Sequence, residues 1–237
     1  MASSILSLIF VAPCTVAFWA FHTSSRSLYS RSRPVRPSVV KIEGVAPSCQ
    51  QALEGSGFVV SAERVMTNAH VVAGTRRLTV QTEGGDSLAA KVVLFDSRTD
   101  IAVLDVPGLS AKALQFDDSS AKPGADAIVL GYPEAGPFTS TAVRVRETIN
   151  LSGPDIYRTN QVLREVYTVR GTIRQGNSGG PMIDPDGDVL GVVFGAFTVT
   201  LALVSRPPKT ARPSRPARAV RPISSRGPRA SWRSCSC

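Results

Sequence analysis

Ser178 lies in a glycine-rich segment, Gly176-Asn177-Ser178-Gly179-Gly180-Pro181, that could expose a reactive hydroxyl group. Glycines on both sides leave the serine Oγ accessible and allow neighbouring backbone N–H groups to converge on one point. A serine hydroxyl is a weak nucleophile at its own pKa, so acyl transfer at this position requires a general base and an oxyanion site. The segment therefore raises the question of which residue could act as the base.

The chain has two histidines, and only His70 has a sequence context that suits a general base. His70 follows a predicted strand, whereas His22 adjoins an apolar N-terminal run and is interpreted as incidental. An imidazole base needs an acid on its other ring nitrogen, and Asp100 opens the apolar run Ile101–Leu104, which places its carboxylate at a strand end. Alone, each residue is more often a turn or core residue, but together they favour nucleophilic catalysis.

Short apolar or β-branched runs separated by Gly, Pro, Asp and Asn recur between residues 39 and 196 and indicate an all-β fold. No helical stretches of about 10–15 residues alternate with these runs, which disfavours a doubly wound α/β sheet. The predicted strands include Gly57–Val60, Leu78–Thr82, Lys91–Phe95, Ile101–Val106, Ala127–Leu130, Ala142–Ile149, Val166–Val169 and Val189–Phe194.

The order His, Asp, Ser in these motifs resembles that of trypsin-like serine proteases of chymotrypsin fold, in particular the compact Deg/HtrA kind. A closer similarity, over about residues 39–196, is to the actinobacterial membrane-anchored acid-resistance serine proteases (MarP-like). The segments that carry it are Val40-Lys41-Ile42-Glu43-Gly44, Glu54-Gly55-Ser56-Gly57-Phe58-Val59, Leu151-Ser152-Gly153-Pro154-Asp155-Ile156-Tyr157 and Val189-Leu190-Gly191-Val192-Val193-Phe194-Gly195-Ala196. The resemblance implies two antiparallel six-stranded barrels with the site between them.

The resemblance also implies a role for each motif residue in a serine endopeptidase that uses an acyl-enzyme. Ser178 would be the nucleophile, His70 the general base and Asp100 the residue that orients it. The backbone N–H groups of Gly176 and Ser178 would form the oxyanion hole. Thr172, six residues before Ser178, would line the primary substrate pocket with Val193, Phe194 and Gly195, and its lack of charge does not support a Lys/Arg preference.

Asn177 departs from the aspartate that the digestive members of the family use to capture a freed N-terminal amine. A neutral amide cannot form that salt bridge, so activation by that route is not expected here. On sequence alone, the substitution Asn177→Asp is expected to leave turnover largely intact.

The net charge of +9 belongs to the ends of the chain. Residues 1–40 contain four arginines and no acidic residue, and residues 189–237 contain nine Lys/Arg and no acidic residue. All 18 Asp/Glu lie in residues 41–188 with 14 Lys/Arg, so the central domain is mildly acidic. The basic C-terminal segment, rich in Arg and Pro, carries no signal for specific nucleic-acid binding.

Three segments are predicted: residues 1–38, 39–196 and 197–237. The first contains the uncharged apolar run 5–21, predicted to be a membrane helix, followed by an Arg/Pro/Ser linker. The second is the protease domain, expected outside the cytoplasm by resemblance, although four arginines after the apolar run favour a cytoplasmic side. The third is rich in Arg and Pro and is predicted to be disordered.

The sequence leaves open whether the second barrel is complete, because the Arg/Pro-rich segment stands where the family continues with further elements. One alternative is therefore a catalytically impaired, protease-like module that binds peptides. Another is a protein that binds nucleic acid or membrane surfaces through its basic end. The four cysteines, Cys14, Cys49, Cys235 and Cys237, form no pattern typical of zinc ligands. No metal or cofactor is expected, the partners are expected to be polypeptide substrates, and the oligomeric state is left open.

Overall fold

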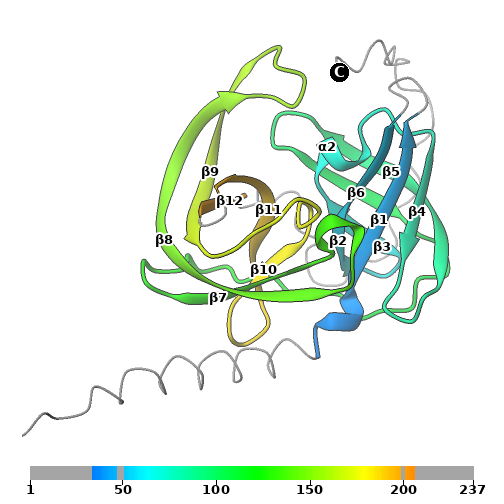
Figure 1. The fold of residues 1–237 in the computed structure, drawn as a ribbon, viewed down its shortest axis with the longest axis horizontal. Helices are drawn as coiled ribbons and strands as arrows, with labels where there is room; N and C mark the ends of the chain where they lie inside the picture. Colours follow the sequence, from blue (N-terminus) through cyan, green and yellow to red (C-terminus); the bar gives the residue numbers. More distant parts are fainter. Residues whose placement is uncertain (1–33, 47–50, 199–200, 206–237) are drawn as a thin grey trace, which may run out of the picture.

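Two sets of six strands, one from each half of the chain, close into separate antiparallel barrels that lie side by side (Figure 1). The computed structural model describes residues 34–46, 51–198 and 201–205. The first barrel has the order β1-β2-β3-β6-β5-β4 and the second the order β10-β11-β12-β9-β8-β7. The strands of the first barrel are β1 (Val39–Ala46), β2 (Gln51–Ser61), β3 (Arg64–Thr67), β4 (Arg77–Gln81), β5 (Ser87–Asp96) and β6 (Ile101–Asp105). Those of the second are β7 (Asp126–Gly131), β8 (Thr139–Pro154), β9 (Gln161–Arg170), β10 (Pro181–Ile183), β11 (Val189–Thr198) and β12 (Leu201–Ser205).

The strands form three apolar cores, because side chains alternate between the two faces of a strand. In β2, Val59 packs inside the first barrel, whereas its neighbour Phe58 joins a core between the barrels. In β7, Val129 packs inside the second barrel and Leu130 faces the first. The shared core fixes the two barrels against each other.

The eight strands predicted from the sequence are all confirmed. The eight predicted runs do not include β1, β3, β10 or β12, and the predicted domain boundary at residue 196 falls inside β11. Beyond that boundary, β12 pairs with β11 on one side and with β9 on the other. The second barrel is therefore closed, and the incomplete form that the sequence left open is not observed.

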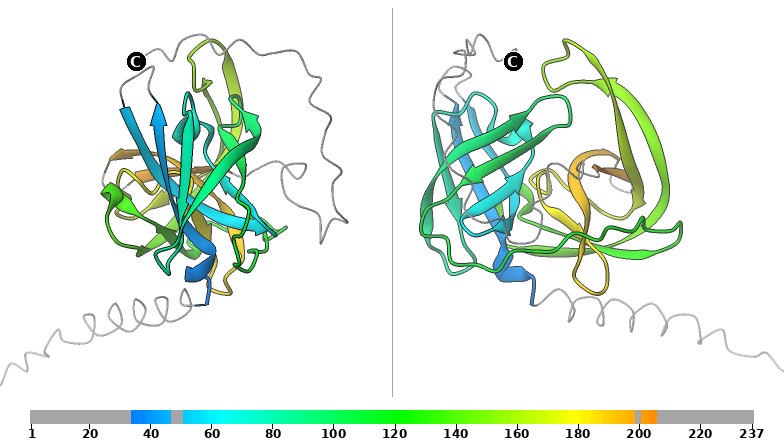
Figure 2. Two further views of the ribbon diagram at one scale, coloured as in Figure 1. Left: turned by 90° about the vertical axis from the view of Figure 1, so that its right-hand side faces the viewer. Right: turned by 180° about the vertical axis from the view of Figure 1, so that it is seen from behind.

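Three short helices and one long hairpin complete the described chain. The helices are η1 (Arg36–Ser38), α2 (Ala69–Val72) and η2 (Pro133–Ala135). The hairpin formed by β8 and β9 rises beyond the second barrel in both views of Figure 2, and its tip reaches the first barrel, where the Ile156 amide donates to the Ser97 carbonyl (3.3 Å). No helix among the described residues is long and apolar enough to span a membrane. The apolar run 5–21 and the basic segment after residue 205 lie outside the described residues.

Candidate active site

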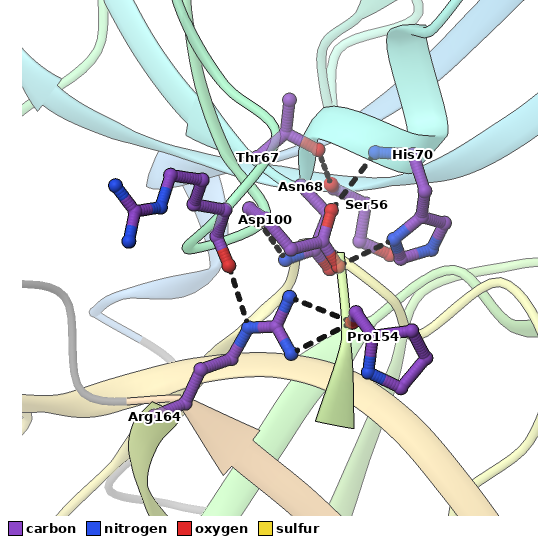
Figure 3. A network of polar contacts seen from close by, with 8 residues as sticks. Ser56, Thr67, Asn68, His70, Asp100, Pro154 and Arg164 are labelled. Carbon is purple, nitrogen blue, oxygen red and sulfur yellow. Dashed lines mark hydrogen bonds and ion pairs between the residues drawn. The ribbon is translucent and has the colours of Figure 1, made fainter. Parts of the chain in front are cut away.

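His70 and Asp100 form a directly hydrogen-bonded pair at the edge of the first barrel (Figure 3). His70 lies on α2, immediately after β3, and Asp100 directly precedes β6. An ionised carboxylate only accepts hydrogen bonds, so the His70 Nδ1–H donates to Asp100 Oδ2 at 2.7 Å. The Asp100 side chain is 6 % exposed and the His70 side chain 39 % exposed. The Asp100 carboxylate is therefore buried behind the His70 ring, whose Nε2 remains free to act as a base.

Two further hydrogen bonds join Asp100 to α2 and to its N-cap residue Asn68. The backbone amide of His70 donates to Asp100 Oδ1 at 2.9 Å, so each carboxylate oxygen has its own donor on His70. The Asn68 side-chain amide, fully buried, donates to the Asp100 carbonyl at 2.8 Å. Asp100 itself has a φ of 59°, in the left-handed region, which these contacts must stabilise.

Ser178 lies in the loop between β9 and β10. Hydrogen bonds from Ser56 on β2 attach this loop to the first barrel. The Ser56 amide donates to the Ser178 carbonyl (2.8 Å), and the buried Ser56 hydroxyl donates to the Gly176 carbonyl (2.7 Å). The same hydroxyl accepts a hydrogen bond from the Tyr132 amide (2.9 Å). One small side chain of the first barrel thus joins two segments of the second.

Close backbone packing brings the Ser178 loop next to α2. A Cβ atom added to Gly55 would lie 2.7 Å from a Val71 methyl group and 3.1 Å from the Ser178 carbonyl oxygen. Gly179, with a φ of 84°, would likewise overlap the Ser56 carbonyl. Val71 is adjacent to His70, so the structure brings the three residues predicted for catalysis into one region. No direct hydrogen bond joins Ser178 and His70 within the described part of the chain.

The amide groups around Ser178 differ in their hydrogen bonding. Asn177 donates to the Arg174 carbonyl, Gly179 to the Val193 carbonyl and Gly180 to the Asn177 carbonyl. The amides of Gly176 and Ser178 have no acceptor among the described hydrogen bonds. These are the two amides that the family resemblance implied for an oxyanion hole.

The residues predicted to contact substrate lie beside this loop. Thr172 is exposed in the segment between β9 and Ser178, and Val193, Phe194 and Gly195 lie on β11. Residues 193 and 195 pair with β12 across an irregularity in the register. On the opposite side, β10 pairs with β11 only as far as Val192. No described strand covers that side of Phe194 and Gly195.

Sequence reasoning did not assign roles to Ser56, Asn68 or Arg164, whose side chains donate hydrogen bonds to the carbonyls of Gly176, Asp100 and Arg98 respectively. Ser56 stands inside the segment 54–59 that carried part of the family resemblance, and Asn68 lies two residues before His70, and these positions were the available signals for them. Arg164 stands in no motif, and only the contact between the barrels shows where it lies. Among the described residues, no group of three or more His, Cys, Asp or Glu could hold a metal ion.

The buried position of Asn177 gives an expectation different from the one drawn from the sequence. Asn177 is 2 % exposed, and its Oδ1 has no hydrogen-bond partner within the described residues. Asn177→Asp would place an unpaired charge there, at a cost of about 3 kcal/mol. We expect a lower melting temperature and reduced activity at neutral pH, measured by thermal unfolding and peptide hydrolysis.

The pH dependence of the stability of Asn177→Asp shows whether the charge of the new carboxylate, and not its shape, causes the destabilisation. Burial would raise the folded-state pKa of the new carboxyl above its unfolded value of about 4, so the destabilisation should shrink as the pH falls towards that value. Asn150→Asp on the exposed face of β8 is the matched control. A variant as stable and active as the wild type at pH 8 would contradict the expectation.

The two barrels, with a His–Asp pair on one and a glycine-flanked serine on the other, define the class of chymotrypsin-fold hydrolases. The family model described as a trypsin-like peptidase domain matches residues 55–192. The chain therefore belongs to the trypsin-like peptidase family of serine endopeptidases.

Similar proteins support this assignment. The serine protease Rv3671c of Mycobacterium tuberculosis is 56% identical over 161 residues, which are 68% of this chain and 40% of that protein. A probable periplasmic DegP-like serine endoprotease of Halomonas elongata is 35% identical over 150 residues, 61% of this chain and 30% of that protein. The chain thus spans less than half the length of these relatives.

A solved structure of the same relative shares the fold. The crystal structure of the Rv3671c protease described as its active form has a TM-score of 0.72 at 45% identity, covering 85% of this chain and 89% of that one. The structure described as the inactive form has a TM-score of 0.67 at 50% identity, covering 74% and 86%.

Proposed function

We propose that this chain hydrolyses peptide bonds through Ser178 as nucleophile, His70 as general base and Asp100 as the residue that orients His70. The observation that carries the proposal is the buried Asp100 carboxylate, which accepts from both the ring and the backbone amide of His70. Such a pair fixes the tautomer that leaves Nε2 free to take a proton from serine. The Ser178 loop packs beside it.

Hydrolysis then follows two steps that this arrangement supports. The Ser178 Oγ attacks the substrate carbonyl carbon while His70 Nε2 takes its proton, and the amides of Gly176 and Ser178 stabilise the oxyanion. His70 returns the proton to the leaving amine, which gives an acyl-enzyme on Ser178. Water, activated by His70, hydrolyses the ester and restores the serine.

The substrates we propose are exposed polypeptide segments in an extended conformation. The uncovered side of Phe194 and Gly195 offers backbone groups to which a peptide strand could add. Thr172 lacks the charge that would select Lys or Arg, which favours a small or apolar residue before the scissile bond. We propose membrane association through residues 5–21 and action outside the cytoplasm, in line with the name of the DegP-like relative.

Labelling with a fluorophosphonate probe tests the proposed nucleophile. The wild-type chain should be labelled, and Ser178→Ala should lose both labelling and at least about 10⁴-fold of its peptide hydrolysis. Ser152→Ala, at an exposed serine on β8, should keep both activities. Equal labelling of Ser178→Ala and the wild type would refute the assignment. Peptide binding without turnover by the wild type would instead select the impaired binding module.

A further inference from the structure

Arg164 of β9 is a buried cation without a carboxylate among its described hydrogen-bond partners. The residue is 8 % exposed, which is rare for arginine unless the group is fully paired. Its Nε donates to the Arg98 carbonyl at 2.8 Å, and its two terminal nitrogens donate to the Pro154 carbonyl at 3.1 and 3.2 Å. The guanidinium group is therefore stabilised by backbone carbonyls.

The two carbonyls belong to different barrels. Pro154 ends β8 in the second barrel, whereas Arg98 lies in the β5–β6 turn of the first, two residues before Asp100. Figure 3 shows the guanidinium group reaching from β9 towards the segment that carries Asp100. The contact between the Ile156 amide and the Ser97 carbonyl (3.3 Å) lies in the same place. The β8–β9 hairpin is thus attached to the turn that presents Asp100.

The β5–β6 turn is only partly stabilised by its own residues. The Asp96 carboxylate accepts from the Arg98 amide (2.9 Å), the Thr99 amide (3.3 Å) and the Thr99 hydroxyl (2.6 Å). Burial would raise the pKa of Asp96, but these hydrogen bonds and the Arg98 charge lower it overall. They end at Thr99, just before the left-handed conformation of Asp100. The Arg98 carbonyl is left for Arg164.

The tip of the hairpin is also held by its own hydrogen bonds. The buried Asp155 carboxylate accepts from the Tyr157 amide (3.1 Å), the Thr159 amide and hydroxyl (2.9 and 2.8 Å) and the Asn160 side chain (3.0 Å). The Asn160 hydrogen bond is the largest influence on its pKa and, with the contacts to Thr159 and Tyr157, outweighs burial and lowers the pKa to about 2. Asp155 therefore stays ionised, and the tip stays bonded, at neutral pH.

We propose that Arg164 is a positioning residue for catalysis: through the Arg98 carbonyl it holds the turn that sets Asp100 against His70. The proposal rests on the catalytic roles proposed above. Arg164 acts from the second barrel, which also carries Ser178, on the acid of the first. Its guanidinium group therefore couples the geometry of the His70–Asp100 pair to the docking of the two barrels.

Kinetics of three variants test this role. Arg164→Met keeps a long stem and removes every donor, Arg164→Lys keeps the charge but not the planar fork, and Arg170→Met is an exposed control on the same strand. We expect Arg164→Met to lower kcat about 100-fold with little change in KM, because only the catalytic pair is displaced. Arg164→Lys should be intermediate and the control unchanged.

The Nδ1 proton of His70 gives a second readout that does not need turnover. A proton shared with a buried carboxylate gives a low-field ¹H resonance, which His70→Gln should remove. Arg164→Met should broaden or shift it, whereas Arg170→Met and Ser178→Ala should not. If Arg164→Met does not fold, the same measurement on Arg164→Lys decides.

Two results would overturn the role of Arg164. One is a normal kcat in Arg164→Met, and the other is an unchanged low-field resonance despite a lower melting temperature, which would make Arg164 a structural residue only. If the wild type neither hydrolyses peptides nor reacts with the probe, the proposed function fails. In that case the resonance alone still decides whether Arg164 positions the His70–Asp100 pair.

Discussion

Asp100→Asn is expected to lower kcat at neutral pH by about 10⁴-fold while leaving the fold intact. The reason is that the Asp100 carboxylate accepts hydrogen bonds from two donors on His70, the backbone amide and the ring Nδ1–H. The His70 backbone amide points at Oδ1 and can only donate, so the single oxygen of an asparagine must stay there. The amide NH₂ then faces His70 Nδ1, which becomes an acceptor. The ring proton moves to Nε2, where it blocks the nitrogen that must take the proton of Ser178.

The measurement is peptide hydrolysis together with the rate of fluorophosphonate labelling, and both should fall in parallel. Asp86→Asn, at an exposed aspartate in the β4–β5 turn, is the matched control and should be neutral. Circular dichroism should show that both variants are folded. A loss of less than about tenfold in a folded Asp100→Asn variant would mean that Asp100 does not set the tautomer of His70.

Gly179→Ala is expected to destabilise the protein by about 4 kcal/mol and to abolish labelling of Ser178. The added Cβ would overlap the Ser56 carbonyl and the Thr67 hydroxyl. Neither can move easily, because the Thr67 hydroxyl donates to that same carbonyl at 2.8 Å. The loop must therefore shift away from β2, which separates Ser178 from His70. Thermal unfolding should show a melting temperature lower by about 10 °C.

Gly187→Ala is the control that separates the overlap from backbone strain. Gly187 has a φ of 98°, but a Cβ added there would meet no heavy atom within 4 Å. It should cost only the left-handed conformation, about 1 kcal/mol, and keep full labelling. Equal effects of the two substitutions would show that strain, and not the contact with β2, explains Gly179.

Much of the fold could be predicted from the sequence because strand formation leaves a local pattern. Consecutive apolar residues in β2 and β7 belong to strands buried on both faces, and turn residues mark their ends. The pattern did not reveal β12, because Leu201–Ser205 precedes an Arg/Pro-rich segment whose composition suggested that the barrel stops earlier. What makes these residues a strand is a long-range pairing with β9, which composition does not record.

The residues of the candidate site likewise fall into two groups, those that a local motif indicates and those that only the tertiary structure reveals. His70, Asp100 and Ser178 stand in short motifs whose residue types suit the chemistry, so they could be found without a structure. The burial of Asn177 and the contact of Arg164 with the Arg98 carbonyl arise where the two barrels meet. They depend on residues far apart in the chain, and no local pattern encodes them.

The arrangement of the strands along the chain also has a consequence for biosynthesis. Residues 39–105 supply the whole first barrel, which can close as soon as it leaves the ribosome. The second barrel needs β12, its last strand, to join β11 to β9. Until Leu201–Ser205 emerge, the barrel that carries His70 and Asp100 can be closed while the barrel that carries Ser178 is still open. If Ser178, His70 and Asp100 act as proposed, peptide hydrolysis would begin only after both barrels have closed.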